Sequence, residues 1–248
     1  PIENPSEYND RYGKFIRGKV VPIASGSEIP KDKLVPRGPG EYYANITYLD
    51  AQLGRVLDEI DARGMRENTI VIFTSDNGPV TSDWRRWWET NAYGSTGGLK
   101  GRKHDLYEGG IKVPAIVRYP GVTTAGSISD QAVIGMDLFT TLVELAGAEI
   151  PDDRPIDGIN IEQILRGQKS VEREMFWALP SDTDAEFVIR KGNWKLLADE
   201  NYQAMDLFNL AEDPLEFFNL VNEKPRLVKQ LLQLMMEKLK SIENDPIR

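Results

Sequence analysis

A helical pattern that leads directly into a short apolar strand constrains the fold of this chain more than any other feature. Between Glu41 and Arg63 apolar residues recur at steps of three and four, which indicates one buried face of a helix. Gly64 follows as a C-cap, and the β-branched run Ile70–Thr74 then predicts a buried parallel strand. Helix, turn and buried strand are one step of an α/β fold, so an α/β domain is expected.

Further elements are expected along the middle of the chain. Val113–Tyr119 and Val133–Gly135 are predicted to be two more strands. A helix over Leu138–Leu145 should end near Gly147, because glycine is common just past the end of a helix. The segment Asp157–Leu165 is predicted to add a short helix.

The pattern changes near Glu174 to short apolar runs separated by turns, which predicts a small antiparallel sheet. A helix over Pro225–Ile242 carries apolar residues at helical spacing and is expected to cover one face of that sheet. The chain is therefore expected to have two parts, residues 1–170 and residues 171–248. The four predicted strands are Met175–Leu179, Phe187–Arg190, Trp194–Ala198 and Met205–Phe208.

Charge and composition exclude several classes of function. The net charge of −9 argues against a broad nucleic-acid surface. No apolar run approaches the roughly 18 residues needed to cross a bilayer, so no membrane span is predicted. The chain has no cysteine, which excludes disulfides, thiolate metal sites and a cysteine nucleophile within it. An anionic ligand would have to be attracted locally, by a few basic groups or by a bound cation.

Asp76 and Asn77 stand directly after the predicted strand Ile70–Thr74. In open α/β sheets ligands collect at the carboxyl ends of strands. A carboxylate and an amide oxygen suit Ca²⁺ or Mg²⁺ better than zinc. Asp-Asn-Gly is also ordinary turn chemistry, and a metal would need at least two further oxygen ligands, so both interpretations stay open on the residues alone.

A second candidate site is the glycine-rich, basic stretch of residues 97–110. Its glycines allow the backbone to approach a ligand. Positive charge for an oxyanion is supplied by Lys100, Arg102 and Lys103. A flexible basic surface loop is the alternative. His104, the one histidine of the chain, is either a structural group or a ligand contact. Glu108 lies beside glycines, which favours a turn with a structural carboxylate.

Other hydrolase mechanisms find little support in the residues. There is no Gly-x-Ser-x-Gly elbow for a serine hydrolase, and no pair of carboxylates has a spacing that singles it out for glycoside hydrolysis. Trp84, Trp87 and Trp88 form an aromatic loop that suits either sugar stacking or ordinary packing.

Four segments together resemble the sulfatase family of the alkaline-phosphatase-like superfamily. Residues 43–78 end in Thr-Ser-Asp-Asn-Gly and are similar to the family's helix, strand and metal segment. Residues 99–121 contain Lys103, Tyr-Glu-Gly-Gly and Tyr-Pro-Gly, as in its second signature. Residues 189–196 and 206–214 resemble its C-terminal subdomain, and the match runs in register from residue 1 to about residue 220.

The resemblance implies a fold and a fragment. The expected fold is a partial alkaline-phosphatase-like mixed sheet with flanking helices, plus a small C-terminal antiparallel sheet packed with a terminal helix. Residues 1–170 would be the C-terminal part of the catalytic α/β domain, and residues 171–248 the small subdomain. The family nucleophile, a formylglycine made within Cys/Ser-x-Pro/Ala-x-Arg, has no counterpart in this chain. The chain is thus expected to be the C-terminal portion of a calcium-dependent sulfatase, inactive by itself.

The resemblance also implies roles for particular residues. Asp76 and Asn77 correspond to two of the four protein ligands of a Ca²⁺ ion, with the other two expected upstream of this chain. Lys103 corresponds to a lysine that contacts sulfate oxygens, and Lys100 to a commonly basic position. His104 falls where the family varies, and is a candidate substrate contact. The proton for the leaving alkoxide would come from Asp76 or from a histidine.

The implied substrate is a sulfate ester, with a sulfated glycan favoured by the aromatic loop. Two alternatives remain at this point: a phosphodiester or phosphonate hydrolase of the same superfamily, and a non-catalytic protein that binds polyanions. The family also implies a periplasmic or secreted protein, although the chain itself contains no export signal.

Overall fold

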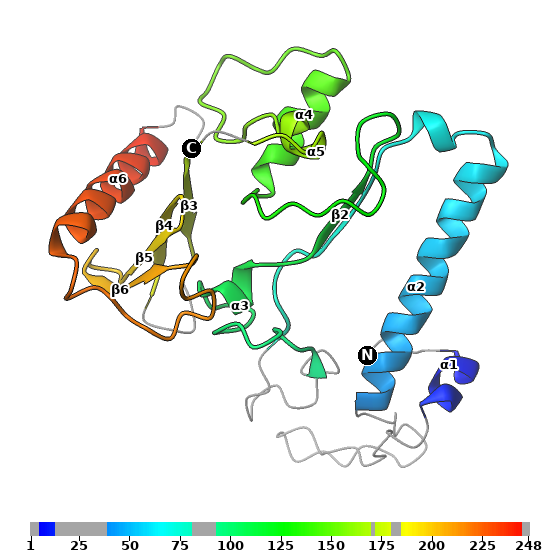
Figure 1. Cartoon of the computed structure of the whole chain (residues 1–248), viewed down its shortest axis with the longest axis horizontal. Helices are drawn as coiled ribbons and strands as arrows, with labels where there is room; N and C mark the ends of the chain where they lie inside the picture. Colours follow the sequence, from blue (N-terminus) through cyan, green and yellow to red (C-terminus); the bar gives the residue numbers. More distant parts are fainter. Residues whose placement is uncertain (1–4, 13–38, 81–92, 170–171, 180–184, 245–248) are drawn as a thin grey trace.

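The computed structural model describes residues 5–12, 39–80, 93–169, 172–179 and 185–244 (Figure 1). It begins with two helices, α1 (Ser6–Arg11) and α2 (Pro39–Ala62). α2 confirms the predicted long helix, and Gly64 closes it with φ of +68°. The N–H group of Met65 donates to the carbonyl of Ile60 at 3.0 Å, as expected for a glycine C-cap.

α1 lies in the first part of the chain, where the sequence shows no sustained apolar period. It packs against α2 through the rings of Tyr8 and Tyr48, whose centroids are 5.1 Å apart. A hydrogen bond of 2.8 Å also joins the hydroxyls of Tyr12 and Thr47. A helix this short is stabilised by such contacts and not by its own periodicity, which explains why the sequence pattern did not reveal it.

Two short strands, β1 (Val71–Thr74) and β2 (Ala115–Arg118), confirm the positions of two predicted strands. The prediction of a buried parallel strand is wrong, because β1 pairs with β2 in antiparallel register and Phe73 is 36% exposed. An apolar run specifies a strand but not the direction of its partner. Burial on both faces would also need covering layers, and the described residues do not provide them at β1.

α4 (Met136–Leu145) confirms the predicted middle helix, and Gly147 ends it with φ of +70°. The predicted strand at Val133–Gly135 is wrong, because these residues lead into α4 without any strand pairing. Of the predicted helix Asp157–Leu165, only the last turn is helical, as α5 (Glu162–Leu165).

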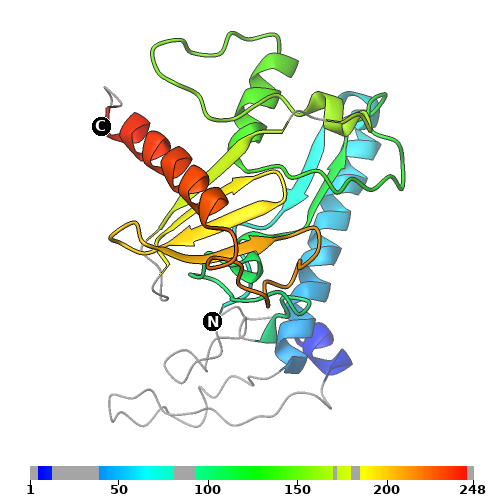
Figure 2. The ribbon, with the colours of Figure 1, turned by 60° about the vertical axis from the view of Figure 1, so that its left-hand side comes forward.

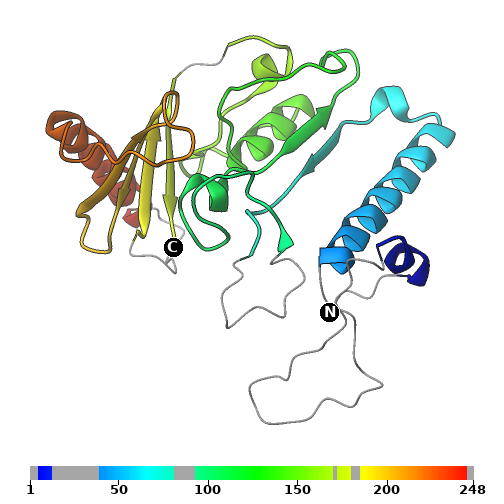
Figure 3. The ribbon, with the colours of Figure 1, turned by 60° about the horizontal axis from the view of Figure 1, so that its bottom comes forward.

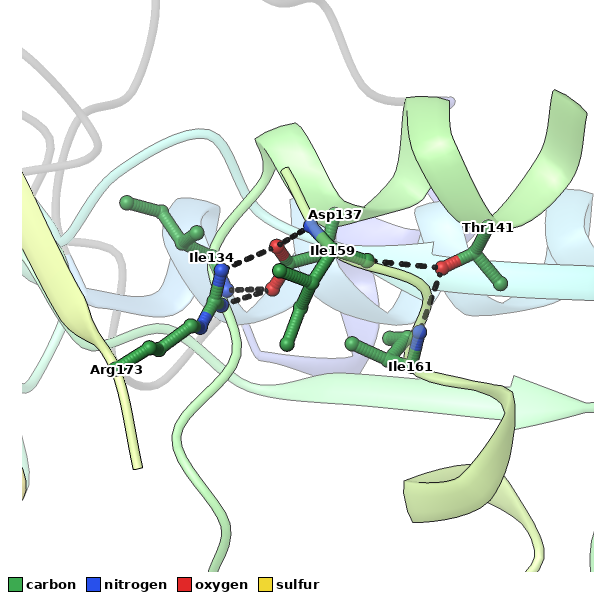
Figure 4. A network of polar contacts seen from close by, with 6 residues as sticks. All are labelled: Ile134, Asp137, Thr141, Ile159, Ile161 and Arg173. Atoms are coloured by element: carbon green, nitrogen blue, oxygen red, sulfur yellow. Dashed lines mark hydrogen bonds and ion pairs between the residues drawn. The ribbon is translucent and has the colours of Figure 1, made fainter. Parts of the chain in front are cut away.

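A buried carboxylate explains why the chain before α4 is not a strand (Figure 4). Asp137 is fully buried and accepts hydrogen bonds from the N–H groups of Ile134, at 2.9 Å, and Ile159, at 3.0 Å. Arg173 binds both of its oxygens. The N–H group of Ile134 is thus used to fix the start of the helix instead of a sheet. In the same network Thr141 accepts from the N–H group of Ile161 at 3.0 Å.

The C-terminal part is a four-stranded antiparallel sheet, which confirms the predicted small antiparallel sheet, and its strands lie side by side in chain order. α6 (Pro225–Glu243) crosses one of its faces (Figure 2). The core between them contains Ile189, Leu196, Leu207, Leu231 and Met235, all at most 1% exposed. The strands are β3 (Glu174–Ala178), β4 (Phe187–Lys191), β5 (Trp194–Ala198) and β6 (Ala204–Asn209).

The opposite face of this sheet is covered by the segment around α3 (Glu108–Ile111), which lies beside it in Figure 3. Leu106 from that segment packs with Val188, Leu197 and Phe208, and all four are at most 1% exposed. Because side chains alternate along a strand, β5 directs Leu196 toward α6 and Leu197 toward α3. The sheet therefore has two apolar faces, one for the terminal helix and one for the glycine-rich stretch.

Two general predictions are addressed only in part. No helix in the described portion of the chain combines the length and the apolar character of a membrane span. The predicted boundary between residues 170 and 171 falls on residues outside the described ranges, and it stays a prediction.

Candidate functional site

The turn after β1 carries the two predicted metal ligands. The Asp76 carboxylate accepts a hydrogen bond of 3.0 Å from the N–H group of Asn77 and lies 3.4 Å from the hydroxyl of Ser75. The Asn77 amide nitrogen donates to the Gly78 carbonyl at 2.9 Å, so the amide oxygen is the atom that can serve as a ligand. Asp76 is exposed and Asn77 is half-buried.

This donor set fits part of a calcium site. A carboxylate oxygen and an amide oxygen are hard ligands of the kind that Ca²⁺ takes, and Ca²⁺ needs six to eight of them. Within the described residues, no group of three or more histidine, aspartate or glutamate side chains is placed to hold a metal ion. Asp76 and Asn77 can thus supply two ligands to a shared shell.

The glycine-rich stretch is folded into a tight loop by its own polar groups. Asp105 accepts a hydrogen bond of 2.7 Å from the N–H group of Arg102. The Arg102 guanidinium donates to the carbonyls of Val80 and Gly94, both at 3.1 Å. One basic group of the stretch therefore ties neighbouring segments together. The interpretation as a flexible basic loop does not fit these bonds.

Main-chain contacts join this loop to the Asp76 turn. The N–H group of Gly78 donates to the Gly110 carbonyl at 2.8 Å, and that of Lys103 donates to the Pro79 carbonyl at 2.9 Å. A Cβ atom at Gly78 would overlap the carbonyl oxygen of Gly109. The structure thus brings the backbone of Lys103 beside the turn that carries Asp76 and Asn77, although these residues are distant in sequence.

The other two predicted substrate contacts are placed differently. The Lys100 ammonium lies 4.0 Å from the centre of the Tyr107 ring and 5.1 Å from that of Phe208. It therefore packs against the C-terminal sheet, in a cation–π arrangement. His104 is half-buried and has φ of +78°, a backbone conformation that residues other than glycine seldom adopt. Substrate contacts by Lys100 and His104 stay predictions.

Glu108 is a structural carboxylate, as its sequence context indicated. Its side chain is buried and accepts a hydrogen bond of 2.9 Å from the Lys195 ammonium. Sequence reasoning did not single out Lys195 or Glu216, the other members of this buried cluster. The signal for Lys195 was a lysine placed within the apolar run Trp194–Ala198, where a solvated charge has no room.

The aromatic loop of Trp84, Trp87 and Trp88 lies outside the described residues, so its two interpretations, sugar stacking and ordinary packing, both stay open.

The chain matches two family models. The sulfatase model covers residues 4–148, and the model for the C-terminal region of N-sulphoglucosamine sulphohydrolase covers residues 101–245. The two matches overlap in the stretch that contains the loop around Lys103, so both the α/β part and the C-terminal sheet have family counterparts.

Curated relatives match over most of the chain. A sulfatase of Formosa agariphila is 34% identical over 231 residues, which is 84% of this chain and 40% of that protein. Human arylsulfatase A is 30% identical over 81% of this chain and 44% of its own length. An N-acetylgalactosamine-6-O-sulfatase of Bacteroides thetaiotaomicron is 28% identical over 83% of this chain and 45% of its own. The chain thus spans less than half the length of these relatives.

Solved structures share the fold. Ps i-CgsB superposes with a TM-score of 0.71 at 21% identity, over 96% of this chain and 47% of that one. A Bacteroides thetaiotaomicron protein described as a sulfatase of glycosaminoglycan metabolism gives a TM-score of 0.64 at 26% identity, over 86% of this chain and 49% of that one. The fold is the α/β sulfatase fold with a small antiparallel C-terminal sheet, and the chain belongs to the sulfatase family.

Proposed function

We propose that the protein containing this chain hydrolyses sulfate esters and that its substrates are sulfated carbohydrates. The observation that carries the proposal is the direct main-chain contact between the Asp76 turn and the Lys103 loop. It places an oxygen donor pair and a lysine on adjoining segments of a sulfatase fold. The carbohydrate part is supported by the N-acetylgalactosamine-6-O-sulfatase among the relatives.

In this proposal Asp76 and Asn77 provide two oxygen ligands for Ca²⁺. The ion, when bound, would activate the nucleophile and stabilise negative charge on the sulfate oxygens. Lys103 adds electrostatic stabilisation to the non-bridging sulfate oxygens. Asp76 or a histidine delivers the proton to the leaving alkoxide. The chain lacks the formylglycine motif, so we expect no turnover from this chain alone.

The test is the substitution Lys103→Ala in the complete protein. We expect kcat for an aryl sulfate to fall by about a hundredfold or more, because an electrostatic contact to the reacting group is lost. KM should change much less than kcat. The matched control is Lys112→Ala, which removes an exposed lysine just after α3 and should leave both constants unchanged. Unchanged kinetics in Lys103→Ala would remove Lys103 from the site.

A second assay on the complete protein distinguishes sulfate ester hydrolysis from the two alternative functions. Aryl sulfate and aryl phosphate esters are assayed in parallel under identical conditions. Faster turnover of the phosphate ester would favour a phosphodiester or phosphonate hydrolase. No turnover of either ester, together with binding of a sulfated polysaccharide, would favour a non-catalytic polyanion-binding protein. We also propose, from the family alone, that the protein is periplasmic or secreted.

A further inference from the structure

A buried cluster of three charged side chains lies between the glycine-rich loop and the C-terminal sheet. Lys195, Glu108 and Glu216 are 0%, 4% and 1% exposed. The Lys195 ammonium is 2.9 Å from a Glu108 oxygen and 2.8 Å from a Glu216 oxygen. Two carboxylates thus share one ammonium in a space closed to solvent. Taking such groups out of water is costly, and a buried ion pair adds little net stability compared with apolar packing. The geometry of the cluster, more than its net stability, is therefore the property to follow.

The three side chains come from three separate elements. Lys195 is on β5, on the same face as Leu197, Glu108 is the first residue of α3, and Glu216 follows β6. Glu216 has φ of +59°, a left-handed conformation that is strained for glutamate. Its second carboxylate oxygen accepts a hydrogen bond of 2.7 Å from the N–H group of Glu108. The cluster therefore fixes the main chain at residue 108 and not only a side chain.

Residue 108 is followed at once by the glycines that join the two parts of the candidate site. The N–H group of Gly109 donates to the Lys100 carbonyl at 2.7 Å, and the Gly110 carbonyl accepts from Gly78 at 2.8 Å. Added Cβ atoms at Gly109 and Gly110 would overlap the carbonyl oxygens of Gly101 and Asp105. A shift of the main chain at 108 would therefore move both the loop of Lys103 and the turn of Asp76.

The two residues before Glu108 also dock on the C-terminal sheet. Leu106 is 1% exposed and packs with Phe208. The Tyr107 hydroxyl donates to the Asp206 carboxylate, which also accepts from the Asn219 amide. Burial, together with this bond, raises the pKa of Tyr107, so the hydroxyl remains a donor. Three successive residues thus attach the loop to β4, β5 and β6.

We propose that Lys195 and Glu216 are positioning residues for the candidate active site. They hold the main chain at Glu108 and, through Gly109 and Gly110, set the placement of Lys103 relative to Asp76 and Asn77. The C-terminal sheet is then the support on which the Lys103 loop is held. This inference rests on the proposed sulfate ester hydrolysis, and it gives the C-terminal part a role in the reaction without any contact to substrate.

The experiment compares three variants of the complete protein. Glu216→Leu removes the acceptor for the Glu108 N–H group and leaves Lys195 paired with Glu108. Glu216→Gln keeps an oxygen that can accept that bond. Asp137→Asn is the matched control, because it weakens the buried ion pair of Asp137 with Arg173, which lies outside the loop. The N–H groups that also donate to Asp137, those of Ile134 and Ile159, lie outside the loop as well. Each variant is measured by amide hydrogen exchange and by kcat and KM for an aryl sulfate.

In Glu216→Leu we expect the amides of residues 103–110 to exchange about tenfold faster or more, because they open without unfolding of the sheet. We expect kcat to fall by about tenfold or more with a smaller change in KM, because misplaced groups cost turnover. Glu216→Gln should recover most of both losses. Asp137→Asn should leave the exchange of this loop and kcat unchanged, even if its Tm falls as much as that of Glu216→Leu.

Unchanged exchange in Glu216→Leu would overturn the inference, and so would faster exchange with unchanged kcat. If this variant fails to fold, amide exchange in the unmodified protein still tests whether the loop is rigidly attached. Its Gly109 amide should then exchange as slowly as the amides of β5, and much faster exchange would contradict a rigid attachment. A protein that turns over no sulfate ester would refute the proposed function. The exchange measurements would still show whether the attachment exists.

Discussion

Glu216 is a carboxylate whose surroundings disfavour its charged form. Burial raises its pKa above the ordinary value of 4.5, and the attraction of Lys195 offsets this only in part. Glu108, which shares the same ammonium, adds repulsion in the same direction as burial. An acid whose pKa is higher in the folded than in the unfolded protein binds more protons when folded. Its contribution to the free energy of unfolding therefore falls as pH rises from the pKa of the unfolded protein to the higher pKa of the folded protein.

The direction of this pH dependence gives a prediction for Glu216→Gln. The glutamine cannot ionise, so the loss of stability that Glu216 contributes as pH rises above about 4.5, its unfolded value, is absent from the variant. We expect the Tm of the variant minus that of the wild type to increase with pH from that value up to neutral pH. Thermal melts of both proteins over a pH series in one buffer system measure it. A difference that stays constant over the whole series would contradict a raised pKa of Glu216.

Among the larger elements, α6 and the β3–β6 sheet enclose a buried apolar core. Met235 is fully buried on the inner face of α6, against Ile189 and Leu196. Its neighbour Met236 is 46% exposed. One turn of the helix therefore offers a buried and an exposed copy of the same side chain.

The pair makes a matched test of this packing. We expect Met235→Ala to lower the free energy of unfolding of this unit by about 3 kcal/mol, because it removes buried atoms and leaves a cavity. Met236→Ala should cost less than about 0.5 kcal/mol, as most exposed substitutions do. Urea denaturation followed by the fluorescence of tryptophans, including Trp177 and Trp194 in the sheet, measures both. Equal losses in the two variants would show that α6 is not docked as described.

The sequence was most informative where one element carries its own periodic signal. The apolar stripes of α2 and α6 predicted both helices nearly to their ends, and Gly64 and Gly147 marked true helix ends. The same signal failed at Val133–Gly135, because the deciding interaction was the bond from the Ile134 N–H group to Asp137. It also could not show that β1 pairs in the antiparallel direction.

In the candidate site, too, residues with a local sequence signal could be predicted and residues brought together only by the fold could not. Local sequence context made Asp76, Asn77 and Lys103 candidates, and motif resemblance gave them roles, because each lies within a contiguous signature. These roles stay predictions. The cluster of Glu108, Lys195 and Glu216 was not foreseen, because no local pattern links a glutamate before two glycines to a lysine on a distant strand. Only the alternation of β5, which turns Lys195 toward α3, brings them together.

At the scale of the whole molecule, large apolar side chains are exposed on several elements. Val56 on α2 is 56% exposed, Ile116 on β2 is 65% exposed, and Phe139 on α4 is 49% exposed. In the described part of the chain β1 pairs only with β2, and a two-stranded sheet is marginal by itself in water. This apolar surface contrasts with the two well-covered faces of the C-terminal sheet.

We therefore expect the 248-residue chain, expressed alone, to self-associate. Size-exclusion chromatography with light scattering should show species larger than one chain at micromolar concentration. The double substitution Ile116→Lys and Phe139→Lys should reduce their share, because it places charges on that surface. A monodisperse sample of the unmodified chain with a single cooperative melt would contradict the expectation.

The contact of Gly78 with Gly109 and Gly110 is made by main-chain atoms alone. Main-chain dimensions are set by covalent bond lengths and angles, which scarcely vary, whereas side chains hop between rotamers. Changes of side-chain rotamer at neighbouring residues therefore do not by themselves break the hydrogen bond that joins the two segments. A substitution of the side chain at Asp76 or Lys103 would therefore change the chemical group there and leave the main-chain junction between the two segments in place.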